Sequence, residues 1–276
     1  MSNSTKVQIP RLTRETQPDA MQISDCVVPI GSDSPSPVEQ FENALAALAR
    51  MSSEISAHSH PEVLGEMIIV SAVASVEAFF RDLLSELVMA CPLVRENLRG
   101  EHITVGAATS YPEGMVGLAL VERELFSSKG VIEKQLRRFM KLDLKGQQEL
   151  KAAISAYERA CTCRHAAAHW RGYVDSATLA ELGVDGAMKT RYQIRTTYEL
   201  VQRVLAACDH LVHTANEVLL DLTVNRWVKA NLISLTDDAV ADDTEMCERL
   251  MKVFASAGAS AISDGATLRS SLVAES

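Results

Sequence analysis

The sequence has few aromatic residues and no uninterrupted apolar stretch of transmembrane length. Aromatic residues make up 5% of the 276 residues, and alanine, leucine and valine supply most of the apolar side chains. This composition favours packed helices over a β-sandwich, because aromatic side chains are enriched in strands. The longest apolar run, MIIVSAVASVEAFF, is interrupted by Ser71, Ser75 and Glu77, so we expect no membrane span.

Several motifs of common enzyme classes are also missing. The sequence contains no GxxxxGK[ST] phosphate loop, no GxGxxG after a strand, no GxSxG nucleophile elbow and no HExxH helix. These absences argue against the familiar nucleotide hydrolases, dehydrogenases, serine hydrolases and zinc proteases.

The six cysteines form no common metal or redox motif, since no two of them are spaced as CxxC. The N-terminal segment MSNSTKVQIPRLTRETQPDA lacks the apolar core of a secretory signal. We therefore expect a cytoplasmic protein with free thiols, because the cytoplasm keeps cysteines reduced. We expect no bound cofactor.

Positive charge is scarce overall but locally concentrated. The chain has a net charge of −9, which argues against a general nucleic-acid coat protein, because such proteins need clustered lysine and arginine. Between Lys129 and Arg171, however, ten lysines and arginines stand against four acidic residues, a local net charge of +6. This segment is either a binding surface for an anionic substrate or a solvated helix face.

Apolar residues recur at steps of three and four in several segments, which predicts an all-α fold. The strongest pattern lies between Pro61 and Pro92, and another runs from Leu150 to Cys161 in a helix that Gly172 is placed to end. No segment alternates with a two-residue period. We expect one domain of long antiparallel helices. The expected helices cover 37–56, 61–91, 114–127, 130–141, 147–171, 191–223 and 240–255.

Both ends of the chain are predicted to be flexible. Residues 1–36 are rich in Ser, Thr, Asp and Pro, and residues 256–276 form a low-complexity tail. The helical domain is expected to cover 37–255, with Ser36 as the N-cap and Pro37 at the first helical position. Residues 93–113 are expected to be irregular.

The stretch CTCRHAAAHWRGYVD, residues 161–175, is where a chemistry can be argued. The apolar rhythm of its helix brings Arg164, and then Ala168, to the side that faces other helices. A guanidinium there requires an anionic partner, which is Glu77, another carboxylate or a substrate phosphate. His165 and His169 are four apart and share a face, and the helix dipole favours a protonated ring at His169.

Three interpretations of these residues remain open. They form a structural network at a helix end, or Cys161, His165 and His169 bind a transition metal such as zinc. In the third interpretation, Arg164 stabilises the charged transition state of a phosphodiester reaction while a histidine moves a proton.

The segment RHAAAH resembles the Arg-x4-to-6-His signature of the HEPN superfamily, with a polar residue, His165, directly after the arginine. The upstream helix SVEAFFRDLLSELV is similar to the first long helix of many bacterial HEPN domains. The order of long helix, excursion, motif helix and long helix also matches, and the resemblance covers roughly residues 40–225.

This resemblance implies a HEPN-type helical bundle that dimerises and brings two motifs into one cleft. It implies a metal-independent endoribonuclease, of the kind found as toxins and phage-defence effectors. Arg164 would contact the scissile phosphate, His169 would be the general acid or base, and His165 would orient the phosphate or the other histidine. The ribose 2′-OH would attack, leaving a 2′,3′-cyclic phosphate and a 5′-OH. Some HEPN domains are instead non-catalytic modules that bind a nucleotide or a protein.

The implied partners are RNA, a second copy of the chain and an antitoxin or other regulatory protein. Several toxin members place a tyrosine two residues after the motif histidine, where an antitoxin modifies it, but this position is Arg171 here. We assign Arg171 to substrate binding. Trp170 either stacks on a base or plugs the end of the bundle. The basic residues expected to guide RNA are Lys134, Arg137, Arg138 and Lys141.

Asp209, His213 and Glu217 also stand four apart, on the last long helix. Such a spacing suits a metal or an acid–base pair, but we expect a solvent-facing series.

Overall fold

The computed structural model describes residues 27, 35–111, 113–170, 172–181, 184, 191–233, 241–256 and 264–274. The chain divides into two structural units, residues 1–34 and residues 35–276. The helices and strands belong to the second unit. The predicted flexible arm, residues 1–36, lies almost entirely outside the described residues, so its flexibility stays a prediction.

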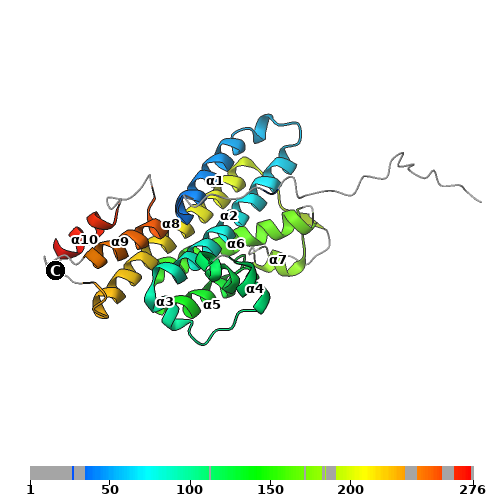
Figure 1. The fold of residues 1–276 in the computed structure, drawn as a ribbon. Helices are drawn as coiled ribbons and strands as arrows, with labels where there is room; N and C mark the ends of the chain where they lie inside the picture. Colours follow the sequence, from blue (N-terminus) through cyan, green and yellow to red (C-terminus); the bar gives the residue numbers. More distant parts are fainter. Residues whose placement is uncertain are drawn as a thin grey trace, which may run out of the picture. The chain divides into compact units, whose positions relative to one another are not determined.

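Four long helices form the centre of the fold: α1 (Pro37–Ser52), α2 (Pro61–Ala90), α6 (Gln148–Trp170) and α8 (Tyr198–Lys229) (Figure 1). This arrangement confirms the prediction of a mostly helical protein. The helices begin where the sequence places caps. The Ser36 side chain accepts a hydrogen bond from the Glu39 N–H at 3.2 Å, Pro37 follows it, and Thr197 caps α8 in the same way.

We expected the long helices to be antiparallel, but one pair of them is parallel. α1 is antiparallel to α8, because Gln202 donates to Ser52 at one end and His213 contacts Glu42 towards the other. α2 and α8 are instead parallel. The Thr196 hydroxyl donates to the Glu62 carbonyl at their N-terminal ends, and the Trp227 indole N–H contacts the Cys91 sulfur at their C-terminal ends. The long excursion between α2 and α6 makes this parallel pairing feasible.

That excursion contains only short helices: α3 (Pro92–Asn97), α4 (Val105–Ser110), the 3₁₀ helix η3 (Glu113–Leu120), α5 (Lys129–Met140) and the 3₁₀ turn η4 (Leu144–Gly146). A further 3₁₀ turn, η2 (Ile55–Ala57), follows α1. The region 93–113, expected to be irregular, therefore includes two six-residue helices. The helix expected at 114–127 is a shorter 3₁₀ segment.

A small antiparallel ladder connects α6 to α8. β1 (Tyr173–Val174) pairs with β2 (Tyr192–Gln193), and the six-residue α7 (Ser176–Glu181) follows β1. Strands of two residues are too short to show an alternation of apolar and polar side chains. The helix expected to start at residue 191 therefore begins later, after β2. α8 begins at Tyr198 and extends to Lys229, six residues beyond its expected end.

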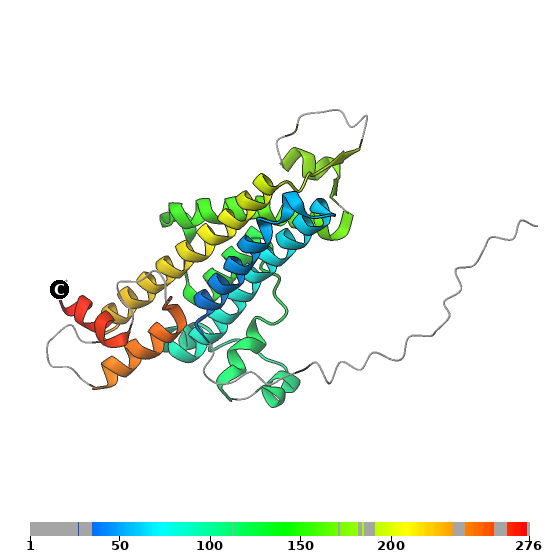
Figure 2. The same cartoon turned by 90° about the horizontal axis from the view of Figure 1, so that it is seen from above.

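The C-terminal segment is helical where a flexible tail was expected. α9 (Ala241–Phe254) is followed by α10 (Gly265–Ala274), and Leu268 of α10 is buried. Gly265 allows this packing, because a Cβ there would lie 2.3 Å from the Glu248 backbone nitrogen of α9. Figure 2 shows α9 and α10 at one end of the long helices and the β1–α7–β2 segment at the other.

α2 is the most buried of the long helices and packs against α1, α6, α8, α9 and η3. α2 has 30 residues and a mean hydropathy of 1.9 over 18 of them, which would suffice to cross a membrane. The expectation of no membrane span was based on the shorter run MIIVSAVASVEAFF and does not extend to the whole helix. Half of the 18-residue window is buried inside the protein, and core helices pass the same test, so this is weak evidence for a membrane.

We predict that Gly65→Ala destabilises the protein, because an added Cβ would lie 2.7 Å from the Thr196 carbonyl oxygen. Overpacking of this kind costs about 1–3 kcal/mol, which thermal unfolding would register as a lower Tm. Gly130→Ala in α5 is the matched control: it meets no atom within 4 Å and should stabilise slightly through helix propensity. Equal melting of both variants would contradict the close approach of α2 to Thr196.

Candidate functional site

The Arg–His stretch forms the C-terminal end of α6 and is supported by a small apolar cluster of its own. Ala166 is 2% exposed and packs with Val174 of β1 and Leu179 of α7. Gly172 allows the chain to turn back here: its φ is +78°, and its N–H donates to the Ala166 carbonyl at 3.0 Å. The predicted helix end at Gly172 is thereby confirmed.

Arg164 lies at the boundary between the packed interior and the surface. Its Nη2 is 3.5 Å from Oε1 of Glu77 on α2, and the two side chains are 22% and 16% exposed. Glu77, the one carboxylate named as a partner from the sequence, is therefore the partner in this structure. The same crossing of α6 and α2 includes a hydrogen bond of 3.5 Å from the Tyr157 hydroxyl to the Val73 carbonyl.

Ala168 does not follow Arg164 into the interior, and this expectation was wrong. Ala168 is exposed, while Cys163 and Ala166 are buried. The last turns of α6 pack on the β1–α7 segment through Ala166, so the buried side of the helix changes there. Of the three consecutive alanines, Ala166 is thus buried and Ala168 is exposed.

His165 and His169 are both exposed and adjacent, as their spacing predicts. Their ring centroids are 4.9 Å apart with an interplanar angle of 54°. Trp170 beside them is 56% exposed, so it does not plug the end of the bundle. Two imidazoles, a guanidinium and an exposed indole therefore occupy two turns at one helix end.

A hollow of about 390 Å³ adjoins this helix end. Glu158, Thr162, Arg164 and His165 of α6 form one wall of it. Ser127 and Ser128, immediately before α5, and Asp175 and Thr178, at the start of α7, line the remainder. Sequence spacing could not reveal these loop residues, because they are brought to α6 only by the tertiary fold.

The structure does not support the metal interpretation of Cys161, His165 and His169. Cys161 is buried, and burial raises the pKa of its thiol to about 12, so the thiolate that zinc requires is disfavoured. Within the described part of the chain, no three His, Cys, Asp or Glu side chains gather in an arrangement suited to a metal ion.

The basic residues of α5 are separated from the histidines. Only the N-terminal end of α5 reaches the hollow, whereas its C-terminal end contacts α3, where the Asn97 side chain donates to the Phe139 carbonyl at 2.8 Å. Arg138 is 2.8 Å from Glu101 Oε2 and also donates to the Leu120 carbonyl.

The hydrogen bond from Arg138 holds the pKa of the Glu101 carboxyl below its usual value, so this arginine has a structural role. Lys134 is 3.7 Å from Glu124. The contribution of Lys134, Arg137 and Lys141 to RNA binding stays a prediction, and Arg171 lies outside the described residues.

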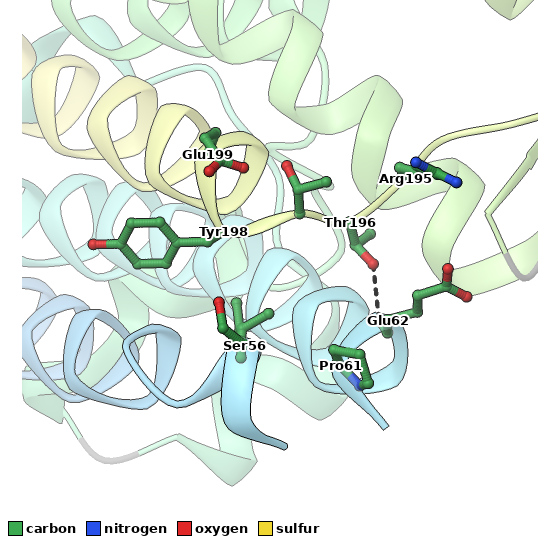
Figure 3. A pocket seen from close by; sticks show the side chains of 9 residues that line it. Ser56, Pro61, Glu62, Arg195, Thr196, Tyr198 and Glu199 are labelled. Carbon is green, nitrogen blue, oxygen red and sulfur yellow. Dashed lines mark hydrogen bonds between the residues drawn. The ribbon is translucent and has the colours of Figure 1, made fainter. Parts of the chain in front are cut away.

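A second hollow, of about 330 Å³, lies where α2 and α8 begin (Figure 3). Glu62 and Glu199 stand in the first turns of these helices, where the helix dipole favours negative charge. Hydrogen bonds from its own backbone N–H and from Thr197 lower the pKa of the Glu199 carboxyl. Two carboxylates and one guanidinium, that of Arg195, thus line this hollow, and no residue of the Arg–His motif does.

We expected the series Asp209, His213 and Glu217 to face solvent, but His213 contacts another helix. His213 Nε2 is 3.0 Å from Glu42 Oε1 on α1, and its Nδ1 is 3.3 Å from Asp209 Oδ1. The Ser256 hydroxyl donates to the same Glu42 carboxylate at 2.7 Å. Glu42 of α1 therefore binds both His213 of α8 and Ser256, just after α9. Glu42 and His213 are 171 positions apart, so local spacing cannot reveal this contact.

Comparisons with protein-family models, with curated proteins and with solved structures find no match. The HEPN resemblance stays a prediction.

We predict that His213 stabilises the fold more at acid than at alkaline pH. Burial lowers the pKa of its ring, but hydrogen bonds to the Asp209 carbonyl and the Glu42 carboxylate outweigh burial and raise it above 6.5. A raised histidine pKa gives stability that is complete below the unfolded value and is lost as the pH rises through the folded one. His213→Gln should therefore cost on the order of 1 kcal/mol after solvent screening at pH 5.5, and less at pH 8.5.

Urea unfolding at the two pH values measures this difference. His210→Gln, at an exposed histidine on the same helix, is the control for the loss of an imidazole from α8. A loss in His213→Gln that is the same at both pH values would contradict a protonated pair with Glu42.

Proposed function

We propose that this protein is a metal-independent endoribonuclease of the HEPN type, with its active site at Arg164, His165 and His169. The observation that carries the proposal is the arrangement at the end of α6. A guanidinium held by Glu77 lies one residue from the first of two exposed imidazoles, and Arg164 and His165 line a hollow, although His169 does not. These are the groups that phosphodiester cleavage needs when no metal takes part.

Arg164 is suited to bind the scissile phosphate. A guanidinium carries five N–H donors, and the contact with Glu77 engages Nη2. Among the described residues, no hydrogen bond from the remaining donors is observed, so they can face a phosphate while Glu77 holds Nη2. Because Arg164 is only 22% exposed, its attraction for the extra charge of the transition state is screened less than at an open surface.

The reaction proceeds by transfer within the RNA. The 2′-oxygen forms a bond to the adjacent phosphorus and loses its proton to a base, and the bond from phosphorus to the 5′-oxygen breaks as that oxygen gains a proton. His169 serves as the general acid or base, and His165, 4.9 Å away, orients the phosphate or the other ring. The products are a 2′,3′-cyclic phosphate and a 5′-OH.

The outer face of α2 supports the proposal of a homodimer. Val63 and Met67 are 54% and 58% exposed, and Ser71 and Ala74 are exposed on the same side. No charged residue occurs from Met67 to Val76. A neutral face can meet its own copy without burying charge. Glu77 follows directly on this helix, so a second copy seated there would approach Arg164.

The second candidate function is a non-catalytic module that binds a nucleotide or a protein at the same place. The observation in its favour is that Arg164 and Glu77 already form an ion pair, which stabilises a helix crossing without any substrate.

Cleavage of an end-labelled RNA pool in EDTA tests the nuclease. We expect the wild type to leave cyclic phosphate ends, and His169→Ala to cut about 10²–10⁴-fold more slowly, because a general acid or base is lost. His58→Ala, at an exposed histidine between α1 and α2, is the control and should cut normally. Equal cutting by all three proteins would place the activity elsewhere, and no cutting by folded wild type would favour the binding module.

Ala74→Arg tests the dimer, because it places a charge in the neutral face of α2 without disturbing the core. Sedimentation at micromolar concentration should give a dimer for the wild type and a monomer for Ala74→Arg, with unchanged helix content. The control is Ala152→Arg, at an exposed alanine of α6 outside this face, which should stay dimeric. A monomeric wild type would refute the shared cleft.

A further inference from the structure

We propose that the hollow beside Arg164 is a nucleobase subsite in which Glu158 selects guanine. The inference rests on the proposed function, since it assigns a base to the nucleotide whose phosphate Arg164 holds. The hollow measures about 390 Å³, and Arg164 and His165 are part of its lining. Pockets of roughly 300–1,000 Å³ hold small ligands, so a base fits beside a phosphate bound at Arg164.

The lining of the hollow carries groups of both charges. It includes Arg164 and His165 and two carboxylates, those of Glu158 and Asp175, together with hydroxyl groups. The cleavage chemistry uses the first pair and leaves the carboxylates without a role. A ligand that combines an anion with hydrogen-bond donors therefore matches the lining, and a guanine nucleotide is such a ligand.

The two carboxylates differ in their freedom to bind. Asp175 Oδ1 accepts the Thr178 N–H at 2.8 Å and caps α7, so it is engaged in the fold. Glu158 is exposed on α6, and no cation among the described residues forms an ion pair with it. Its two oxygens are therefore the acceptors available to a ligand in the hollow.

Guanine presents the donors that such a carboxylate accepts. Its Watson–Crick edge carries the ring N1–H and the exocyclic N2 amino group side by side, and proteins bind splayed RNA bases on this edge. Uracil offers one N–H between two carbonyl oxygens, which a carboxylate repels. Ser128 adds a complementary group: its oxygen accepts the Val131 N–H, which leaves the hydroxyl proton to donate to an acceptor such as guanine O6.

The test compares cleavage of oligonucleotides that differ only in the base next to the cleavage site. We expect the wild type to prefer guanine over uracil by roughly tenfold or more, as good bidentate contacts do. Glu158→Gln should lose most of this preference while still cutting, because an amide has one acceptor oxygen. Glu149→Gln, an exposed residue in the first turn of the same helix, is the control and should keep the preference.

A second measurement separates the two proposals: calorimetric binding of GMP and UMP to the same three proteins. Cleavage without a guanine preference, or with a preference that Glu158→Gln retains, overturns the subsite and leaves the nuclease standing. If no RNA is cut but GMP binds better than UMP through Glu158, the nuclease proposal is refuted and the subsite is supported. Absence of both cleavage and discrimination overturns both.

Discussion

Burial of α2 on several sides is the constraint on which the rest of the structure depends. α1, α6, α8, α9 and η3 all pack against this helix, so its side chains set where the other elements lie. Phe79, Phe80, Leu83 and Leu84 are 0–2% exposed, which fixes the rotation of the helix about its axis. That rotation presents Glu77 to α6 and leaves Val63 and Met67 uncovered. The site and the outer face are two consequences of one packing arrangement.

The ion pair between Glu77 and Arg164 serves both stability and chemistry. A guanidinium near the interior without a carboxylate would be costly, so the pair stabilises the crossing of α6 and α2. The same carboxylate orients the arginine before any substrate arrives, which lowers the entropy lost on binding. The structural-network and phosphodiester interpretations of the sequence thus describe one geometry, and only chemistry on a substrate separates them.

The sequence was informative where interactions are local. The caps at Ser36 and Pro37, the span of α2, the end of α6 at Gly172 and the adjacency of His165 and His169 all follow from spacings of a few residues. The pairing of Arg164 with Glu77 could also be predicted from the sequence, because both residues lie in segments with strong helical periodicity.

Features that arise from distant packing could not be predicted in this way. The β1–β2 ladder is two residues long and shows no periodicity, and α10 lies in a segment whose many Ala, Ser and Gly residues resemble a flexible tail. The contact of His213 with Glu42, and the meeting of Ser128, Glu158 and Asp175 around one hollow, depend on the path of the chain between them. The course of the chain through the fold cannot be predicted from residue spacing or from composition.

The apolar cluster of Ala166, Val174 and Leu179 is separate from the main core, and this has a dynamic consequence. Three buried side chains contribute little free energy, so the β1–α7 segment should open locally far more often than the bundle unfolds. Its amide hydrogens would then exchange with solvent while those of α2 stay protected. Asp175 and Thr178 would move away with it, and one side of the hollow would widen enough to admit a ligand.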